Sequence, residues 1–290
     1  MFEGFTQHRV KTTGAEINFR RAGKGPPLLL LHGYPQTHVL WHRMAPDLAR
    51  RFTVVTPDLR GYGDSSKPPS DASHMPYSKR VMAEDMVELM AGLGFQRFAV
   101  AGHDRGGRVA YRMALDHPGI VSKLAVLDIV TTHTMWTMMD KARATTGFHW
   151  LFLMQPDGLP ETMIGNDPAY YLREMLRRWA RPGFVFAPEA MAEYIRCFSD
   201  PACIHATCED YRAGGTVDFE LDTADFGKRK IACPVLALWG GGGIARRASD
   251  PLAAWRPWAD DVRGRAIADC GHFLPEEAPE ETRKGLEEFL

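Results

Sequence analysis

Residues 102–106 read Gly-His-Asp-Arg-Gly, the spacing of a sharp nucleophile turn with Asp104 in its centre. An apolar run at 98–101 precedes this turn, and a helical pattern follows it to about residue 115. Small residues suit such a turn because two chain segments pass closely there. The alternative role for Asp104 is a helix N-cap. The strand before the turn and the helix after it favour the nucleophile.

The central Asp indicates which bonds this nucleophile attacks. A carboxylate that attacks an ester forms an anhydride, which has no easy way forward. A carboxylate that displaces a leaving group from a saturated carbon forms an ordinary ester, which water then hydrolyses. The chain has no G-x-S-x-G string, which disfavours a serine hydrolase. Asp104 therefore predicts alkyl halides or epoxides as substrates.

A base and an orienting acid follow later strands. His272 comes after the last expected strand and before the final helix, so we expect it to activate water against an ester on Asp104. Asp128 follows the fourth strand among apolar neighbours, where a carboxylate is costly unless it is paired. The fifth strand is followed by glycines, and the next acid, Asp250, suits a helix cap before Pro251. Asp128 is therefore the expected partner of His272.

Two arginines lie beside the predicted nucleophile. Arg105 and Arg108 are three residues apart at a helix start, so they share a face, and the helix dipole adds to their positive charge. Two guanidinium groups suit an anionic substrate, best a carboxylate held through a forked hydrogen bond. The alternative is salt bridges to nearby acids, which we expect for Arg112. The local charge predicts a small anionic substrate.

The elements that must position these residues alternate between strand and helix. Apolar runs and helical spacing indicate strand 27–31, strand 53–57, helix 78–93 with a Ser78 cap, strand 98–101, a helix to about 115, strand 123–128, strand 234–239, a weaker strand 262–267 and helix 275–290. Such alternation predicts an α/β fold with a mostly parallel, doubly wound sheet. Residues 131–232 interrupt it without a strong strand. We expect an inserted helical cap there, and an α/β core formed by 1–130 and 233–290.

Composition limits the classes of function. The 290 residues carry 35 Lys plus Arg and 36 Asp plus Glu, whereas nucleic-acid binders usually show a basic excess. No stretch approaches the roughly 18 apolar residues of a membrane helix, and the N-terminus lacks a signal-peptide pattern. Five cysteines without a C-x-x-C pair indicate a reducing compartment. We expect a cytoplasmic protein with no nucleic-acid or membrane partner. Cys203, His205 and Cys208 do not have zinc-site spacing, and we expect no metal.

Taken together, these strings resemble the α/β hydrolases, and within them the fluoroacetate (haloacetate) dehalogenases. The resemblance covers nearly the whole chain and rests on Leu-Leu-His-Gly-Tyr-Pro-Gln at 30–36, Gly-His-Asp-Arg-Gly-Gly-Arg at 102–108 and Gly-His-Phe at 271–273. It implies the α/β-hydrolase fold. It also implies that Asp104, Asp128 and His272 form a catalytic triad.

The same resemblance implies the remaining site residues. They are the backbone N–H groups of Tyr34 and Arg105 for an oxyanion hole, Arg105 and Arg108 for the substrate carboxylate, and His149, Trp150 and Tyr211 for the departing halide. From the residues alone, Trp150 suits a core position. Haloalkane dehalogenases place Trp directly after the nucleophile, so Arg105 favours a haloacid over a neutral haloalkane.

The predicted reaction is hydrolytic dehalogenation of a short 2-haloacid, fluoroacetate first, to glycolate and halide through an Asp104 ester. No metal or organic cofactor is implied, and the resemblance suggests a homodimer. Two alternatives stay open. Cap tyrosines at 170, 171 and 194 could protonate the oxygen of an epoxide, which would make the protein an epoxide hydrolase. A catalytically silent ligand-binding homologue is the other, and the complete triad argues against it.

Overall fold

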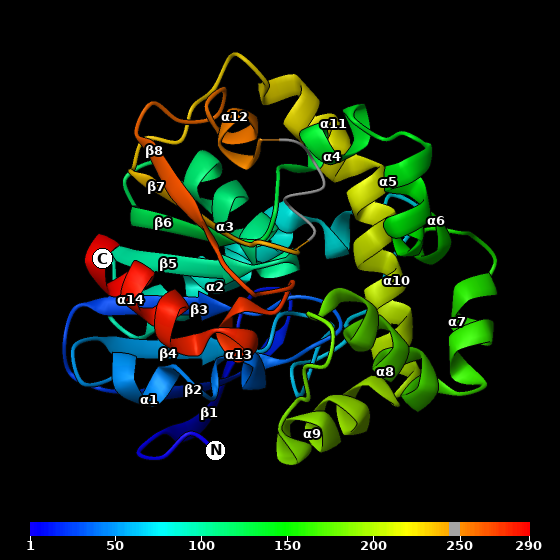
Figure 1. The fold of residues 1–290 in the computed structure, drawn as a ribbon, viewed down its shortest axis with the longest axis horizontal. Coiled ribbons are helices and arrows are strands. Elements are labelled where there is room, and N and C mark those ends of the chain that lie inside the picture. The colour runs from blue at the N-terminus through cyan, green and yellow to red at the C-terminus, as the bar shows by residue number, and fades with distance from the viewer. Residues whose placement is uncertain (244–249) are drawn as a thin grey trace.

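The computed structural model describes residues 1–243 and 250–290, and within them the chain is built around one eight-stranded sheet (Figure 1). The strands are β1 (Thr6–Lys11), β2 (Glu16–Ala22), β3 (Pro27–Leu31), β4 (Thr53–Pro57), β5 (Phe98–His103), β6 (Val121–Leu127), β7 (Val235–Gly240) and β8 (Val262–Ile267). Across the sheet their order is β1-β2-β4-β3-β5-β6-β7-β8. β2 pairs antiparallel with β1 and β4, and every other neighbouring pair is parallel.

This sheet confirms the predicted α/β class, and the six predicted strands correspond to β3 through β8. The apolar runs predicted them because parallel strands covered by helices on both faces are buried throughout. The hairpin of β1 and β2 was not predicted. β1 is almost wholly exposed and has no apolar run. In β2 the signal is a short alternation, with Ile17 and Phe19 buried between polar neighbours.

Helices outside the interval between β6 and β7 flank the sheet. They are η1 (His38–Trp41), α1 (Ala45–Leu48), η2 (Met75–Tyr77), α2 (Lys79–Gly92), α3 (Arg105–Asp116), α12 (Pro251–Trp255), α13 (Leu274–Glu277) and α14 (Pro279–Phe289). The single helix predicted at 275–290 is wrong, because the chain breaks at Ala278 with φ −140° and ψ 58°. Pro279 disfavours helical geometry in the residue before it, so α13 ends and α14 begins there.

Eight helices occupy the fully described chain between β6 and β7, and no strand lies among them. They are α4 (Thr132–Thr137), α5 (Lys141–Thr146), α6 (Phe148–Leu153), α7 (Leu159–Gly165), α8 (Pro168–Trp179), α9 (Pro188–Phe198), α10 (Pro201–Gly215) and α11 (Val217–Asp225). Figure 1 shows them gathered beyond one end of the strands, with α10 running through their midst. Their separation into a cap domain at 131–232 stays a prediction.

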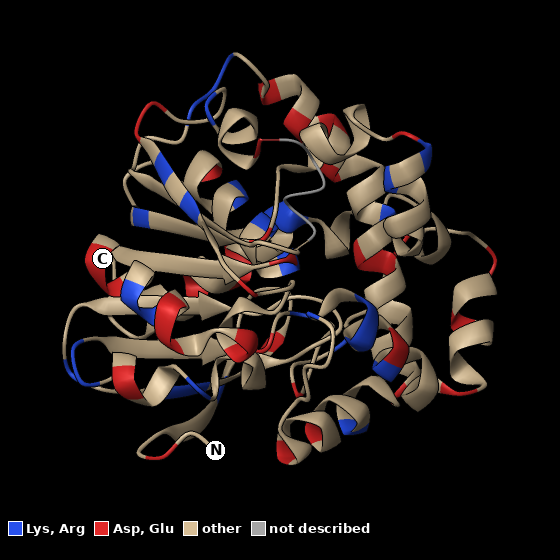
Figure 2. Cartoon of the chain, in the orientation of Figure 1, with Lys and Arg blue, Asp and Glu red and all other residues tan. Residues whose placement is uncertain are grey.

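Charged residues are spread over the molecule. Figure 2 shows acidic and basic segments mixed on the helices and around the sheet, in agreement with the net charge of −1. Among the described residues, no helix combines the length and the apolar character needed to cross a bilayer.

The N-terminal cap of α2 provides a test of the local fold. Ser78 is buried, and its hydroxyl accepts the N–H of Val81 at 3.2 Å, as the sequence predicts. Ser78→Ala removes this acceptor, and we expect the free energy of unfolding to fall by about 1 kcal/mol in urea titrations. Ser199→Ala is the matched control, because Ser199 is exposed and its hydroxyl makes no hydrogen bond within the described chain. Equal losses in both variants would contradict the capping role.

Candidate active site

The predicted nucleophile turn lies between β5 and α3. Asp104 has φ 47° and ψ −119°, a strained conformation for a residue with a side chain. Gly106 permits the turn, because a Cβ there would lie 2.2 Å from the carbonyl oxygen of His32. Asp104 accordingly does not cap α3 with its side chain, so the N-cap alternative is not what the structure shows. The turn presents the carboxylate at the end of β5.

The loop after β3 holds one oxygen of this carboxylate. The backbone N–H of Tyr34 donates to Asp104 Oδ1 at 2.9 Å. Gly33 allows the approach, because a Cβ there would lie 2.4 Å from the Cβ of Asp104. The other predicted donor, the N–H of Arg105, lies at the start of α3 and makes no hydrogen bond to the carboxylate in the described chain. Tyr34 is thus in contact with the predicted nucleophile, Asp104, and Arg105 is the next residue along the chain.

His272 connects the nucleophile with Asp128. Its Nδ1 lies 2.6 Å from Asp128 Oδ2, and its Nε2 lies 3.8 Å from Asp104 Oδ2, with all three side chains almost wholly buried. Burial acts to lower the pKa of His272, but the hydrogen bond and charge of Asp128 outweigh it and raise that pKa. The backbone N–H of His272 donates to the carbonyl of Trp179 at 2.9 Å, which ties this loop to α8.

Asp128 directly follows β6, with φ 52°. Its Oδ1 accepts the backbone N–H of Gly240 at 3.2 Å, while Oδ2 faces His272. A Cβ on Gly243 would lie only 2.3 Å from Asp128 Oδ1. The glycines after β7 therefore leave room for a carboxylate that comes from the neighbouring strand. Asp250, the other acid considered, accepts the N–H of Leu252 and caps α12, as predicted.

Burial acts to raise the pKa of Asp104, yet this pKa lies below its usual value. Positive charge outweighs the burial, led by His272 and followed by Arg105 and Arg108 among others. The carboxylate is consequently ionised, and an ionised carboxylate is the form that acts as a nucleophile.

The two arginines differ in their partners. Arg105 is fully buried, and its Nε and Nη2 donate to the side chain of Asp210 at 3.1 and 2.5 Å. Within the described chain, its Nη1 is buried without a hydrogen-bond partner. Arg108 is also buried, but no carboxylate lies within 4 Å of its guanidinium in the described chain, and its Nη1 donates to Thr132 Oγ1 at 3.1 Å. Arg112 pairs with acids, as predicted.

The three predicted halide ligands lie close together. His149 and Trp150 come from α6 and Tyr211 from α10, with the Tyr211 ring centroid 5.6 and 5.3 Å from the other two. The guanidinium of Arg105 lies 4.2 Å from the Tyr211 ring, and that of Arg108 lies 4.7 Å from the Trp150 ring. The cluster thus meets α3, the helix that begins at the nucleophile turn.

Both titratable members of this cluster are uncharged at neutral pH. Burial lowers the pKa of His149 to about 3, against an opposing effect from Asp104. Burial also raises the pKa of Tyr211 well above its usual value, and the charge of Asp104 adds to the rise. An imidazole and a phenol in these states are neutral hydrogen-bond donors.

Two neighbours of these side chains were not predicted. Asp210, which holds Arg105, directly precedes Tyr211, so an acid beside an expected ligand was the available signal. Trp179 ends α8, and its ring centroid lies 4.5 Å from that of His149 and 5.8 Å from that of His272. In the described ranges, no group of three or more His, Cys, Asp or Glu side chains is arranged to hold a metal ion.

Comparison with known proteins agrees with this geometry. The model of the alpha/beta hydrolase fold family matches residues 26–279. A fluoroacetate dehalogenase from Burkholderia sp. is 47% identical, over 100% of this chain and 95% of that protein. A soluble epoxide hydrolase from Corynebacterium sp. strain C12 is 36% identical, over 95% of this chain and 93% of that protein.

A solved structure from Nostoc sp. PCC 7120, described as an alpha/beta hydrolase, is 60% identical with a TM-score of 0.97, and the match covers 100% of this chain and 99% of that one. The family model spans most of the sheet and all the helices between β6 and β7. The chain therefore belongs to the α/β-hydrolase family of enzymes and is a relative of the haloacetate dehalogenases within it.

Proposed function

We propose that this protein hydrolyses the carbon–halogen bond of short 2-haloacids, with fluoroacetate as the preferred substrate. One observation carries the proposal: beside the ionised nucleophile Asp104 lies a buried guanidinium, Arg108, without a carboxylate partner in the described chain. A buried cation needs a counter-charge, and a substrate carboxylate supplies it. The buried Nη1 of Arg105 is a further donor for the same group. The name of the Burkholderia relative supports this substrate class.

In the first step, Asp104 Oδ2 attacks the α-carbon in line with the halogen. The carbon–oxygen bond forms, the carbon–halogen bond breaks with its electron pair, and halide leaves. Oδ1 is engaged with the N–H of Tyr34, whereas Oδ2 lies 3.8 Å from His272 Nε2, beyond a hydrogen bond, and is open for attack. His149, Trp150 and Tyr211 donate to the departing halide.

Once Asp104 is a neutral ester, its charge no longer favours protonated His272, which loses its proton to solvent. In the second step, the neutral His272 removes a proton from water through Nε2, and the hydroxide adds to the carboxyl carbon of the Asp104 ester. The backbone N–H of Tyr34 stabilises the negative charge on the former carbonyl oxygen, with the N–H of Arg105 as a second donor. Collapse of this intermediate expels the alkoxide of glycolate, which takes the proton from His272. Asp104 then loses its acidic proton to solvent. Asp128 keeps the His272 ring in position throughout.

An epoxide hydrolase is the second candidate, because a relative with that name is 36% identical and Tyr211 offers a phenol beside the site. Ring opening leaves an alkoxide that needs a proton, whereas halide needs only hydrogen bonds. Of the three cluster members, the Trp150 indole cannot supply that proton, and burial keeps His149 neutral. Burial and the charge of Asp104 raise the pKa of Tyr211 well above its usual value, which makes its phenol a weak acid. A halide is the leaving group that suits this set better. The cytoplasmic location and the homodimer stay predictions.

A substrate panel separates the two candidates. We expect turnover of fluoroacetate and chloroacetate, measured as halide release, and little turnover of a neutral chloroalkane or a neutral epoxide, because only the acids pair with Arg108. Faster turnover of either neutral compound would contradict the role of the arginines.

The covalent intermediate is testable by blocking its hydrolysis. His272→Asn removes the base but leaves Asp104 in place, so incubation with fluoroacetate should leave a carboxymethyl adduct visible by intact-protein mass spectrometry. Peptide mapping should place the adduct on Asp104, and Asp104→Asn should stay unmodified. A folded His272→Asn protein that never gains this mass would rule out the ester mechanism.

Arg108 and Arg105 should fail in different ways. Arg108→Gln removes a cation without an acidic partner, so we expect KM for fluoroacetate to rise about 10²-fold, the size of a lost buried charge contact. Arg105→Gln breaks the ion pair with Asp210, while Lys79 and Tyr62 still hold that carboxylate, so we expect the free energy of unfolding to fall by about 2–3 kcal/mol. Steady-state kinetics and urea titration measure the two effects. An equal loss of stability in both variants would contradict the inference that Arg105 is held by an ion pair and Arg108 is not.

A further inference from the structure

Arg108 is oriented through neutral groups. In the described chain its Nη1 donates to Thr132 Oγ1, while its Nε is buried without a hydrogen-bond partner. The guanidinium also lies 4.7 Å from the Trp150 ring, but the face of a ring leaves it free to turn in its own plane. A guanidinium that binds a carboxylate through a fork must instead hold one orientation. Whatever stands behind Thr132 therefore decides where Arg108 points.

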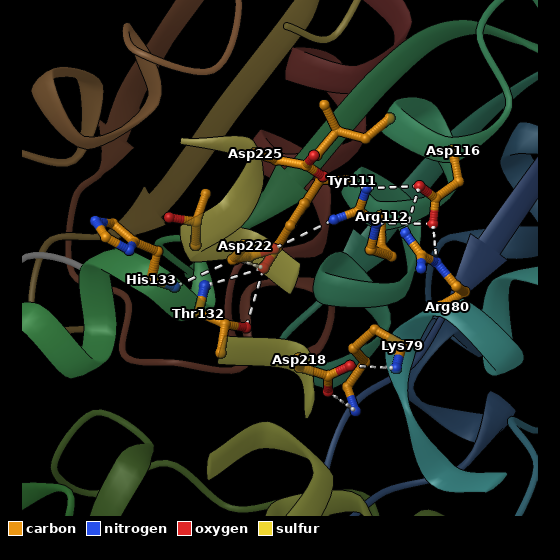
Figure 3. A network of polar contacts seen from close by, with 12 residues as sticks. Lys79, Arg80, Tyr111, Arg112, Asp116, Thr132, His133, Asp218, Asp222 and Asp225 are labelled. Carbon is orange, nitrogen blue, oxygen red and sulfur yellow. Dashed lines mark hydrogen bonds and ion pairs between the residues drawn. The ribbon is translucent and has the colours of Figure 1, made fainter. Parts of the chain in front are cut away.

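Behind Thr132 lies a chain of close polar contacts (Figure 3). The hydroxyl oxygens of Thr132 and Tyr111 are 3.0 Å apart, and the Tyr111 hydroxyl lies 2.6 Å from Asp222 Oδ2. The backbone N–H of Thr132 donates to the Tyr111 oxygen at 3.0 Å, and the N–H of His133 donates to Asp222 Oδ2 at 3.2 Å. Thr132, Tyr111 and Asp222 are all at most about 1% exposed. The contacts form a continuous path from Arg108 to a buried carboxylate.

The chemistry of these groups sets the direction of the protons. The phenol of Tyr111 has one proton, and the shorter contact to the Asp222 carboxylate takes it. The Thr132 hydroxyl then donates to the Tyr111 oxygen, which leaves a lone pair on Thr132 for Arg108. Each bond in this series polarises the next. The negative charge of Asp222 thus makes Thr132 a better acceptor for the arginine.

Three neighbours favour the charged form of Asp222 against the effect of its burial. Burial raises its pKa to about 6, while the Tyr111 hydroxyl, the N–H of His133 and the charge of Arg112 favour the charged form. Arg112 lies 3.6 Å from Asp222 Oδ1, whereas its closer contacts are with Asp116 and Asp225. Arg112 therefore compensates the charge of Asp222 only in part, and the Asp222 carboxylate still polarises the Tyr111 hydroxyl.

We propose that Asp222 is a positioning residue for substrate binding, which holds the guanidinium of Arg108 in its binding orientation through Tyr111 and Thr132. The inference rests on the proposed function, in which Arg108 binds the carboxylate of a 2-haloacid. Asp222 lies on α11, Thr132 begins α4, and Arg108 and Tyr111 lie one turn apart on α3. Helix α11, from the interval between β6 and β7, would thereby fix the orientation of Arg108 on α3.

A second contact of α11 supports this assignment. Asp218, one turn before Asp222, accepts the backbone N–H of Lys79 at 2.8 Å and lies 3.4 Å from its Nζ (Figure 3). Lys79 also pairs with Asp210, the acid that holds Arg105. One face of α11 is thus connected with both arginines. Ion pairs through Lys79 and Asp210 lead to Arg105, and the hydroxyl groups of Tyr111 and Thr132 lead to Arg108.

The test compares Asp222→Asn with Asp225→Asn. Asparagine keeps the shape and the acceptor of Asp222 but removes its charge, so we expect KM for fluoroacetate to rise about tenfold, as when a charge-assisted hydrogen bond is weakened, with kcat changed less than about threefold. Asp225 lies on the same helix and pairs with Arg112, and in the described chain its connection to Arg108 passes through Arg112 and Asp222, not through a contact of its own. Its variant should keep the KM of the parent protein. An unchanged KM in a folded Asp222→Asn protein overturns the proposal.

A double variant distinguishes this failure from failure of the proposed function. If Asp222 acts through Arg108, adding Asp222→Asn to Arg108→Gln should raise KM no further. An undiminished effect of Asp222→Asn in that background would show an independent role and overturn the inference. If Arg108→Gln alone leaves KM unchanged, the carboxylate anchor of the proposed function is wrong.

Thr132→Val provides a second route to the same question should Asp222→Asn fail to fold. Valine has nearly the shape of threonine but no hydroxyl, so it interrupts the path next to Arg108 and leaves Tyr111 and Asp222 in contact. We expect the same rise in KM with little change in kcat. A parent-like KM in this variant, with its fold intact by circular dichroism, contradicts the relay.

Discussion

The role proposed for Asp104 requires a carboxylate that is buried and yet charged, and the surroundings of Asp104 meet both demands. Burial alone would raise its pKa, and nearby positive charge brings it below the usual value. The reaction also requires one carboxylate oxygen to be fixed and the other to be free to attack. The N–H of Tyr34 holds Oδ1, whereas Oδ2 lies 3.8 Å from His272 Nε2, beyond hydrogen-bond distance. Glycines stand at the turn because the backbone of neighbouring loops lies too close for a Cβ. The arginines contribute to the positive charge that keeps Asp104 ionised.

Positive charge near Asp104 is divided between two unlike arginines, and this division has a physical reason. Two unpaired guanidinium groups on one helix face would repel each other in a buried site, where Coulomb interactions are strong. Asp210 compensates Arg105 and, with Tyr62 and Lys79 also on its carboxylate, is held firmly itself. Arg108 keeps its charge for a ligand. Among the described residues of the site, Arg108 is the arginine without a carboxylate partner, which agrees with the small monocarboxylate proposed as substrate.

The sequence predicted what depends on chain order and not what depends on packing between distant helices. Asp104, Asp128 and His272 could be placed because each follows a strand of a parallel sheet, and carboxyl ends of such strands meet at one edge. The pairing of Arg105 with Asp210 could not, because 105 residues separate them and many acids lie in helical segments. The path from Thr132 to Asp222 could not be predicted for the same reason, because the two residues lie on different helices far apart in sequence. Strands without apolar runs, such as β1, could not be predicted either.

The proposed reaction moves negative charge rather than creating it, which explains the character of the groups around it. Before attack, the charges lie on Asp104 and on the substrate carboxylate. After attack, the substrate carboxylate keeps its charge, the new ester group at Asp104 is neutral, and the other negative charge lies on the halide. The groups that receive the halide must therefore favour a charge that arrives late. A protonated histidine would attract Asp104 and halide alike, whereas neutral donors lose little when the halide is absent. Burial keeps His149 neutral and Tyr211 protonated, so both have the neutral donor groups that the proposed halide site requires.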